Sequence, residues 1–198
     1  GVELAVGCGY KYLNGGPGAP AFLYIARELQ PEMISPIRGW MGHADPFGFD
    51  DAYVPAPVID RFLAGTPPIL GLAALEAGVD LMLGIDQHAL FGKSQRLFQM
   101  FADLMAARCP DFALISPDRA EQRGSHIGFA HPQASAIMNA LIAQGVIGDF
   151  RAPDVLRFGL TPLYIRFEDI WQAVDILAGI MASGAWRLAQ HAEIKRVT

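Results

Sequence analysis

Two short apolar runs near the start of the chain enclose a glycine-rich stretch. Leu-Ala-Val-Gly occupies residues 4–7 and Ala-Phe-Leu-Tyr-Ile occupies residues 21–25. Apolar runs of this length, bounded by glycine and proline, predict buried strands. We therefore expect a strand, a loop over residues 7–18 and a second strand, with Lys11 close to the end of the first one.

The pattern then changes to a loop and two helices. Arg27–Met33 is spaced for a short helix, whereas residues 36–57 combine glycine, proline and aromatic residues in a way typical of a functional loop. Thr66, followed by two prolines, has the sequence of a helix N-cap, and the helix is expected to stop near Gly78. Apolar residues at helical spacing predict a longer helix over residues 86–108.

The last part of the chain mixes short strands and helices. Strands are expected at residues 112–115, 126–130 and 155–160, because these runs are apolar or alternate with period two. Helices are expected at residues 132–144 and 167–181, where apolar residues recur along one side. This order predicts a small α+β domain that begins at about residue 109.

Composition narrows the class of protein. The 198 residues are 52% hydrophobic and 18% charged with a net charge of −5, which argues against nucleic acid as the main partner. The hydropathy is high enough to suggest surface that is buried against something outside this sequence. Cys8 and Cys109 imply neither a disulfide framework nor a zinc site, so a reduced, cytoplasmic setting is the default expectation.

Membrane, targeting and metal signals are weak. The apolar run 67–85 is interrupted by Glu76 and Asp80, which favours a buried helix over a membrane span. We see no signal peptide at the start of the sequence. The five histidines show no spacing typical of metal ligands, so no metal site is expected.

Two polar residues in the first half are candidates for chemistry. A lysine at the end of a buried strand is partly desolvated, and a desolvated amine is suited to covalent chemistry with carbonyl groups. The alternative, which the local pattern favours, is an ordinary lysine that reaches solvent from a strand end. Thr66 either caps its helix or marks a helix N-terminus that receives an anion.

Trp40 and Arg157 also have two interpretations each. Trp40 either packs its own loop or forms an aromatic wall for a ligand ring. Arg157 stands on the opposite face of its strand from Leu156 and Phe158. It is either a surface arginine in a weak ion pair or a planar fork that recognises a carboxylate.

Several segments together resemble the kynureninase family of pyridoxal phosphate (PLP) enzymes, in the class V aminotransferase superfamily. They cover nearly the whole chain in the family's order: residues 10–18, 39–43, 65–69, 123–126, 146–151 and 156–164. Tyr10 before Lys11 is specific, because the related cysteine desulfurases usually carry histidine there.

The resemblance implies roles for matching residues. Lys11 would hold PLP covalently and later move protons, and Tyr10 would reach the cofactor phosphate and serve as an acid. Trp40 and Thr66 would contact the phosphate from the neighbouring subunit of a homodimer, with the site at the subunit interface. Arg157 would hold the α-carboxylate of the substrate.

The resemblance also implies a fold and its parts. The expected class is α/β, with the C-terminal part of the large domain of a fold type I PLP-dependent transferase followed by a small α+β domain. Residues 1–85 would end the PLP-binding large domain, 86–108 would be a connecting helix, and 109–198 the small domain. The family's phosphate-binding turn, ring-stacking aromatic residue and pyridine-nitrogen aspartate have no counterpart here, so the likeness is to the C-terminal half only.

The implied reaction is hydrolysis of L-kynurenine, and of 3-hydroxykynurenine, to anthranilate or 3-hydroxyanthranilate and L-alanine, in tryptophan catabolism and NAD biosynthesis. The isolated chain is expected to be inactive and not to bind PLP productively. Two alternatives stay open. One is another class V PLP enzyme, an aminotransferase or a desulfurase-like protein. The other is a non-catalytic fragment that keeps only the dimer surface.

Overall fold

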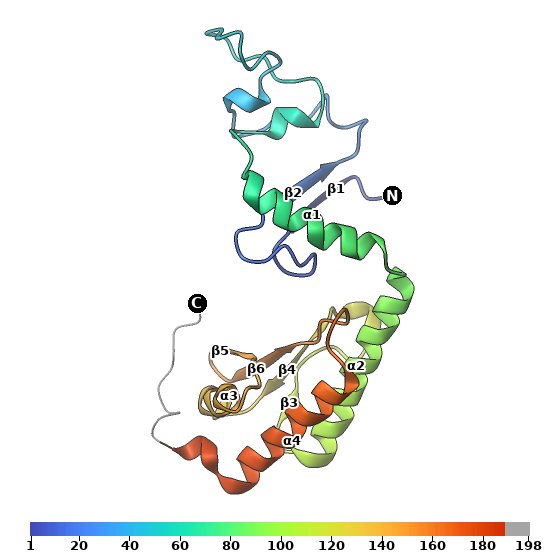
Figure 1. The fold of residues 1–198 in the computed structure, drawn as a ribbon, viewed down its shortest axis with the longest axis vertical. Helices are drawn as coiled ribbons and strands as arrows, with labels where there is room; N and C mark the ends of the chain where they lie inside the picture. Colours follow the sequence, from blue (N-terminus) through green and yellow to red (C-terminus); the bar gives the residue numbers. More distant parts are fainter. Residues whose placement is uncertain (189–198) are drawn as a thin grey trace. The chain divides into compact units, whose positions relative to one another are not determined.

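The chain divides into two compact units, Gly1–Ile85 and Asp86–Thr198. The computed structural model describes residues 1–188 (Figure 1). The boundary falls between the two long helices, α1 (Ile69–Leu83) and α2 (Gln87–Arg108). Each unit has its own sheet, two-stranded in the first unit and four-stranded in the second.

The first unit contains the expected strand, loop and strand. Strands β1 (Leu4–Cys8) and β2 (Ala21–Ile25) pair in antiparallel register, and α1 lies beside them in Figure 1. The expectation that these strands are buried is wrong for the described residues. Val6 is 80% exposed and Tyr24 is 49% exposed, whereas Ile25 is buried. A two-stranded sheet has too little surface around it to bury both of its faces.

Helix α1 begins and ends later than its sequence suggests. Pro68, not Thr66, occupies the N-cap position, because each residue that precedes a proline is disfavoured in the helical region. The helix also continues through Gly78 to Leu83. Glycine is needed at position 78 because a Cβ atom there would lie 2.1 Å from the carbonyl oxygen of Leu13.

Residues 27–33 form hydrogen-bonded turns in place of the expected short helix. The cause is the buried side chain of Arg61. Its Nη1 atom donates hydrogen bonds to the carbonyl oxygens of Gln30, Pro31 and Met33 at 2.7, 2.8 and 3.0 Å. Carbonyl groups that converge on one guanidinium cannot also point along a helix axis.

The expected loop over residues 36–57 is confirmed. It contains one short 3-10 turn, η1 (Trp40–Gly42), and an isolated bridge between His43 and Pro55. A second 3-10 turn, η2 (Ile59–Phe62), follows the loop and contacts η1.

The second unit is a four-stranded antiparallel sheet with three helices. The strand order is β3-β4-β6-β5. The strands and remaining helices are β3 (Ala113–Leu114), β4 (His126–Ala130), β5 (Asp149–Arg151), β6 (Val155–Gly159), α3 (Ala134–Ala143) and α4 (Phe167–Ser183). The sequence pattern indicated all of these elements except β5, which is the shortest after β3.

The side chains on one face of this sheet pack with the helices to form a single hydrophobic core. Ile127, Phe129, Leu156 and Phe158 are at most 6% exposed and share the core with residues of α2, α3 and α4. The expected alternation along residues 155–160 is confirmed. The alternate residues of β6 therefore lie on the opposite face of the sheet.

Helix α2 packs into the second unit against α4. The carboxylate of Asp86 caps it and accepts hydrogen bonds from the backbone N–H groups of His88 and Ala89 at 2.8 and 3.2 Å. A connecting role for residues 86–108 in a larger protein stays a prediction. Within residues 1–188, every helix is too short or too polar to cross a membrane.

Two glycine-to-alanine substitutions in helices test the close contact at Gly78. Gly179→Ala in α4 meets open space and is expected to stabilise the chain by about 0.5–1 kcal/mol, because alanine is the better helix former. Gly78→Ala is expected to destabilise the first unit by about 1–3 kcal/mol, because the methyl group meets backbone. Urea unfolding of each variant measures both changes, and stabilisation by Gly78→Ala would contradict the contact.

Candidate functional site

Lys11 lies on a tight turn that follows β1. The backbone N–H of Asn14 donates to the carbonyl oxygen of Lys11 at 3.0 Å, and that of Gly15 donates to Gly9 at 3.0 Å. The Lys11 side chain is exposed, and its Nζ atom lies 5.1 Å from the ring centre of Tyr10. The described residues therefore do not provide the partial burial that the sequence predicted for this amine.

The turn that carries Lys11 is fixed against α1. A Cβ atom on Gly15 would lie 3.2 Å from the Cα atom of Leu75, and Gly78 meets Leu13 as described above. Asn14 has a positive φ of 59°, a conformation that asparagine tolerates better than most residues. The lysine is thus exposed on a backbone that packing holds in place.

Trp40 and Thr66 lie close together in the same unit. A Cβ atom on Gly65, the residue before Thr66, would lie 3.9 Å from the indole Nε1 of Trp40. Trp40 is 48% exposed and packs edge-on against Phe47 at 5.8 Å between ring centres. Thr66 is exposed, and its hydroxyl has no hydrogen-bond partner among residues 1–188. The indole N–H of Trp40 therefore lies near the backbone that immediately precedes Thr66.

These two pairs of candidates occupy different parts of the first unit. In Figure 1 the loop between β1 and β2 lies on one side of α1, whereas the light blue η1 turn lies beyond the N-terminal end of α1. An open pocket of about 470 Å³ adjoins Trp40. Its lining is aromatic and acidic: Trp40, His43, Asp45, Pro46, Phe47, Phe49, Asp50, Asp51 and Tyr53.

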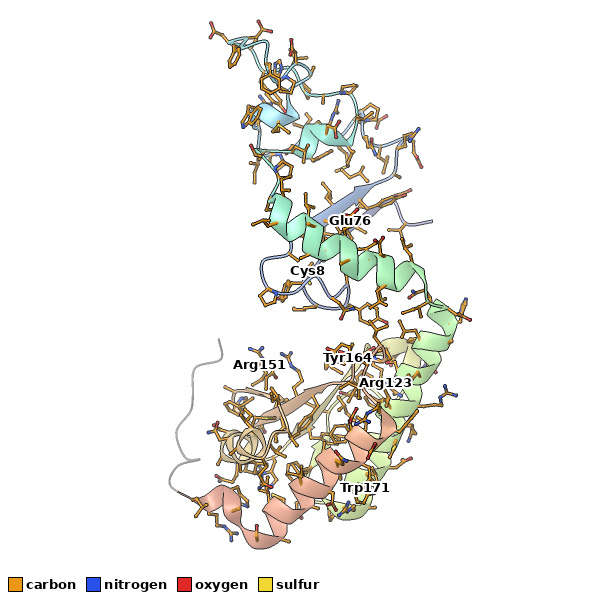
Figure 2. The ribbon with its side chains drawn as sticks, in the orientation of Figure 1. Cys8, Glu76, Arg123, Arg151, Tyr164 and Trp171 are labelled. Carbon is orange, nitrogen blue, oxygen red and sulfur yellow. The ribbon has the colours of Figure 1, made fainter. Side chains whose placement is uncertain are left out.

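Arg157 lies in the second unit and pairs with a carboxylate of its own sheet. Its Nε atom donates to Oδ1 of Asp149 at 2.9 Å, and its Nη2 atom donates to Oδ2 at 2.5 Å. Nη2 of Arg151 reaches the same Oδ2 atom at 3.1 Å. Figure 2 shows the Arg151 side chain projecting away from α3. The sequence left Arg157 as either an ion-pair partner or a carboxylate-binding residue. The contacts among the described residues show the ion pair.

The pairing favours the charged forms of Asp149 and Arg157. Burial raises the pKa of Asp149, but hydrogen bonds and charge from Arg157, and then from Arg151, outweigh it and hold that pKa below its usual range. The hydrogen bond to Asp149 raises the pKa of Arg157. The sequence pattern did not single out Asp149 or Arg151 because β5 was not expected. The alternation of Asp149, Phe150 and Arg151 was the signal that could have shown a strand.

Residues 1–188 contain no group of three or more His, Cys, Asp or Glu side chains placed to hold a metal ion. His191, one of the five histidines, lies outside the described residues. His43 and His131 bond within their own loops, to Asp45 and to the backbone N–H of Gln133.

Comparison with solved structures defines the class of fold. The chain matches the cysteine desulfurase CsdA from Escherichia coli with a TM-score of 0.71 and 20% identity, over 92% of this chain and 47% of that one. It matches the cystine C–S lyase C-DES with a TM-score of 0.68 and 21% identity, over 89% and 46%. The fold is therefore a mixed α/β arrangement that corresponds to about half of each of these two enzymes.

Sequence comparison is more specific. The profile described as the kynureninase C-terminal domain matches residues 90–177. Kynureninase from Burkholderia mallei is 46% identical over 199 aligned residues, which span 100% of this chain and 48% of that protein. The Pseudomonas fluorescens kynureninase is 43% identical over 96% of this chain and 46% of its own length. The chain is homologous to these kynureninases along its whole length and spans about half the length of each of them.

The Asp149–Arg157 pair predicts how stability depends on pH. Because folding lowers the pKa of Asp149, its stabilising effect is complete above the unfolded-state pKa of about 3.9 and is lost as the pH falls through the folded-state value. Asp149→Asn is expected to cost about 0.2–1 kcal/mol at pH 7 and less in acid. Urea unfolding over a pH series measures the difference, and a gap that widens in acid would contradict the prediction.

Proposed function

We propose that this chain forms the C-terminal half of a kynureninase that hydrolyses L-kynurenine to anthranilate and L-alanine, and 3-hydroxykynurenine to 3-hydroxyanthranilate. The observation that carries the proposal is 46% identity to a kynureninase over an alignment that spans the whole chain. The desulfurase and lyase structures share the fold at only 20–21% identity, and fold alone does not specify a reaction.

The residues in the loop after β1 fit the cofactor's requirements. An exposed lysine amine and a tyrosine hydroxyl lie next to each other on a turn that α1 holds in place. Bound PLP supplies the electron sink for the carbanion that forms at the substrate. We assign Lys11 as the residue that holds PLP and moves the proton of the substrate α-carbon, and Tyr10 as a phosphate contact and acid.

Trp40 and Thr66 support a site that is shared between subunits. Both residues are exposed, and in Figure 1 the η1 turn, which contains Trp40, lies apart from the loop between β1 and β2. The indole N–H and the hydroxyl are donors suited to phosphate oxygens. We infer that they contact the PLP phosphate in the neighbouring subunit of a homodimer.

Arg157 is assigned to the α-carboxylate of the substrate. Its side chain is 39% exposed on the face of the sheet opposite the core, so a ligand can reach it. In the overall reaction, water adds to the side-chain ketone and the Cβ–Cγ bond breaks. Anthranilate leaves with the carbonyl carbon, and a proton delivered to Cβ completes L-alanine.

Exposed apolar residues in the first unit indicate further contacts. Leu70, Val6 and Leu83 are 89%, 80% and 79% exposed, which is more apolar exposure than an isolated unit usually carries. We attribute these contacts to the remainder of the enzyme. The same contacts would withdraw Lys11 from water, which the described residues do not do.

Joining this chain to the N-terminal part of the Burkholderia mallei enzyme tests the proposal. The fusion is expected to release anthranilate from L-kynurenine, whereas the 198-residue chain alone with PLP is expected to give none. In the fusion, Lys11→Ala is expected to lower kcat by at least about a hundredfold, because it removes the proton-transfer group.

Lys93→Ala is the matched control, since it removes an equal charge from α2 in the second unit. Anthranilate fluorescence measures turnover in each variant. Full activity of Lys11→Ala would reject the assigned lysine. Release of sulfide from cysteine in place of anthranilate would favour a desulfurase-like enzyme, and turnover by the chain alone would overturn the half-site proposal.

A further inference from the structure

The Arg157 guanidinium is held by one edge only. A guanidinium can meet a carboxylate with its Nε and Nη2 atoms or with its Nη1 and Nη2 atoms. Asp149 takes the first edge with both of its oxygens, at 2.9 and 2.5 Å. Among residues 1–188, no acceptor bonds to Nη1, so the second edge is available to another carboxylate.

Strand register fixes Asp149 beside Arg157. The two residues lie directly opposite each other on β5 and β6. On the other side of Arg157, the paired residue of β4 is Gly128, which has no side chain to compete for the guanidinium. Arg151 holds Asp149 from a second direction. The carboxylate is therefore fixed by cross-strand pairing and by two cations.

The charges of the cluster favour a further anion. Two arginines share one carboxylate, so the cluster keeps an excess of positive charge on the outer face of the sheet. A substrate carboxylate on the open edge would balance that excess without displacing Asp149. A fixed guanidinium also loses less conformational freedom on binding than a free one.

We propose that Asp149 is a positioning residue, which grips the Nε–Nη2 edge of Arg157 and presents the Nη1–Nη2 edge to the α-carboxylate of the substrate. This inference rests on the proposed role of Arg157. It makes the opposite prediction to simple competition, in which Asp149 would occupy the arginine until substrate displaced it. If Asp149 positions the arginine, removing its carboxylate raises KM for the substrate. If Asp149 competes with the substrate, removing its carboxylate lowers KM.

Steady-state kinetics of the PLP-loaded enzyme that contains this chain give the first test. Asp149→Asn is expected to raise KM for L-kynurenine about tenfold, equivalent to about 1.4 kcal/mol of binding, with kcat changed less than about threefold. In the same variant, the kcat/KM for L-kynurenine divided by the kcat/KM for its carboxamide should also fall. A structural defect alone would not reduce that ratio.

Asp175→Asn is the matched control, because Asp175 pairs with Arg108 on the helices of the same unit. It should leave KM and the carboxamide ratio unchanged. A lower KM for Asp149→Asn would establish competition and overturn the inference. If Arg157→Ala raises KM while Asp149→Asn has no effect, the inference fails and the proposed function stands.

Acetate binding to the 198-residue chain gives a test that needs no turnover. In the natural chain, acetate is expected to shift the NMR signals of the Arg157 Nη protons while the Nε proton stays bonded to Asp149. In Asp149→Asn, the acetate affinity should fall about tenfold, and in Asp175→Asn it should not change. Tighter acetate binding by Asp149→Asn, or loss of the Nε bond when acetate binds, would overturn the inference.

Discussion

The contact between the Leu13 carbonyl and Gly78 determines where the first unit places its lysine. The loop between β1 and β2 approaches α1 so closely that a side chain at position 78 would meet the backbone. Loops are usually the most variable and mobile part of a fold, but close packing of this loop's backbone against α1 restricts its conformation. The turn that carries Lys11 depends on this packing, since its own hydrogen bonds are few and local.

The two units differ in how fully they bury their apolar surface. In the second unit, one face of the sheet and three helices form one closed core, in which Leu156 and Leu141 are completely buried. The first unit leaves many apolar residues of β1, β2 and α1 exposed. This contrast is consistent with a chain that matches half the length of its kynureninase relatives.

The charged cluster on the second sheet changes how the arginine is understood. An arginine that is paired in a structure is often set aside as a surface ion pair of little value. Here the pair uses one edge of the guanidinium, so being paired and being available for a ligand do not exclude each other. Asp149 and Arg157 lie opposite each other on neighbouring strands. Backbone pairing therefore sets the distance between the carboxylate and the guanidinium.

The sequence by itself determined most of the regular elements and the likeness to kynureninase. The pattern of apolar residues predicted helices α1 and α2 and the strands at residues 126–130 and 155–160. Such a pattern reflects which face of each element is buried. The ordered resemblance of segments led to kynureninase before any fold was known, and the comparisons confirm that homology. The roles of Lys11, Tyr10, Trp40, Thr66 and Arg157 stay predictions.

Only the tertiary structure decided features that depend on residues distant in sequence. Helix α1 passes through Gly78 because Leu13 packs there, and residues 27–33 are turns because Arg61 draws their carbonyls together. Strand β5 exists because β6 offers it an edge, and this pairing gives Arg157 its carboxylate partner. Local propensity carries no information about such contacts, since each depends on a partner that the chain brings into place only when it folds.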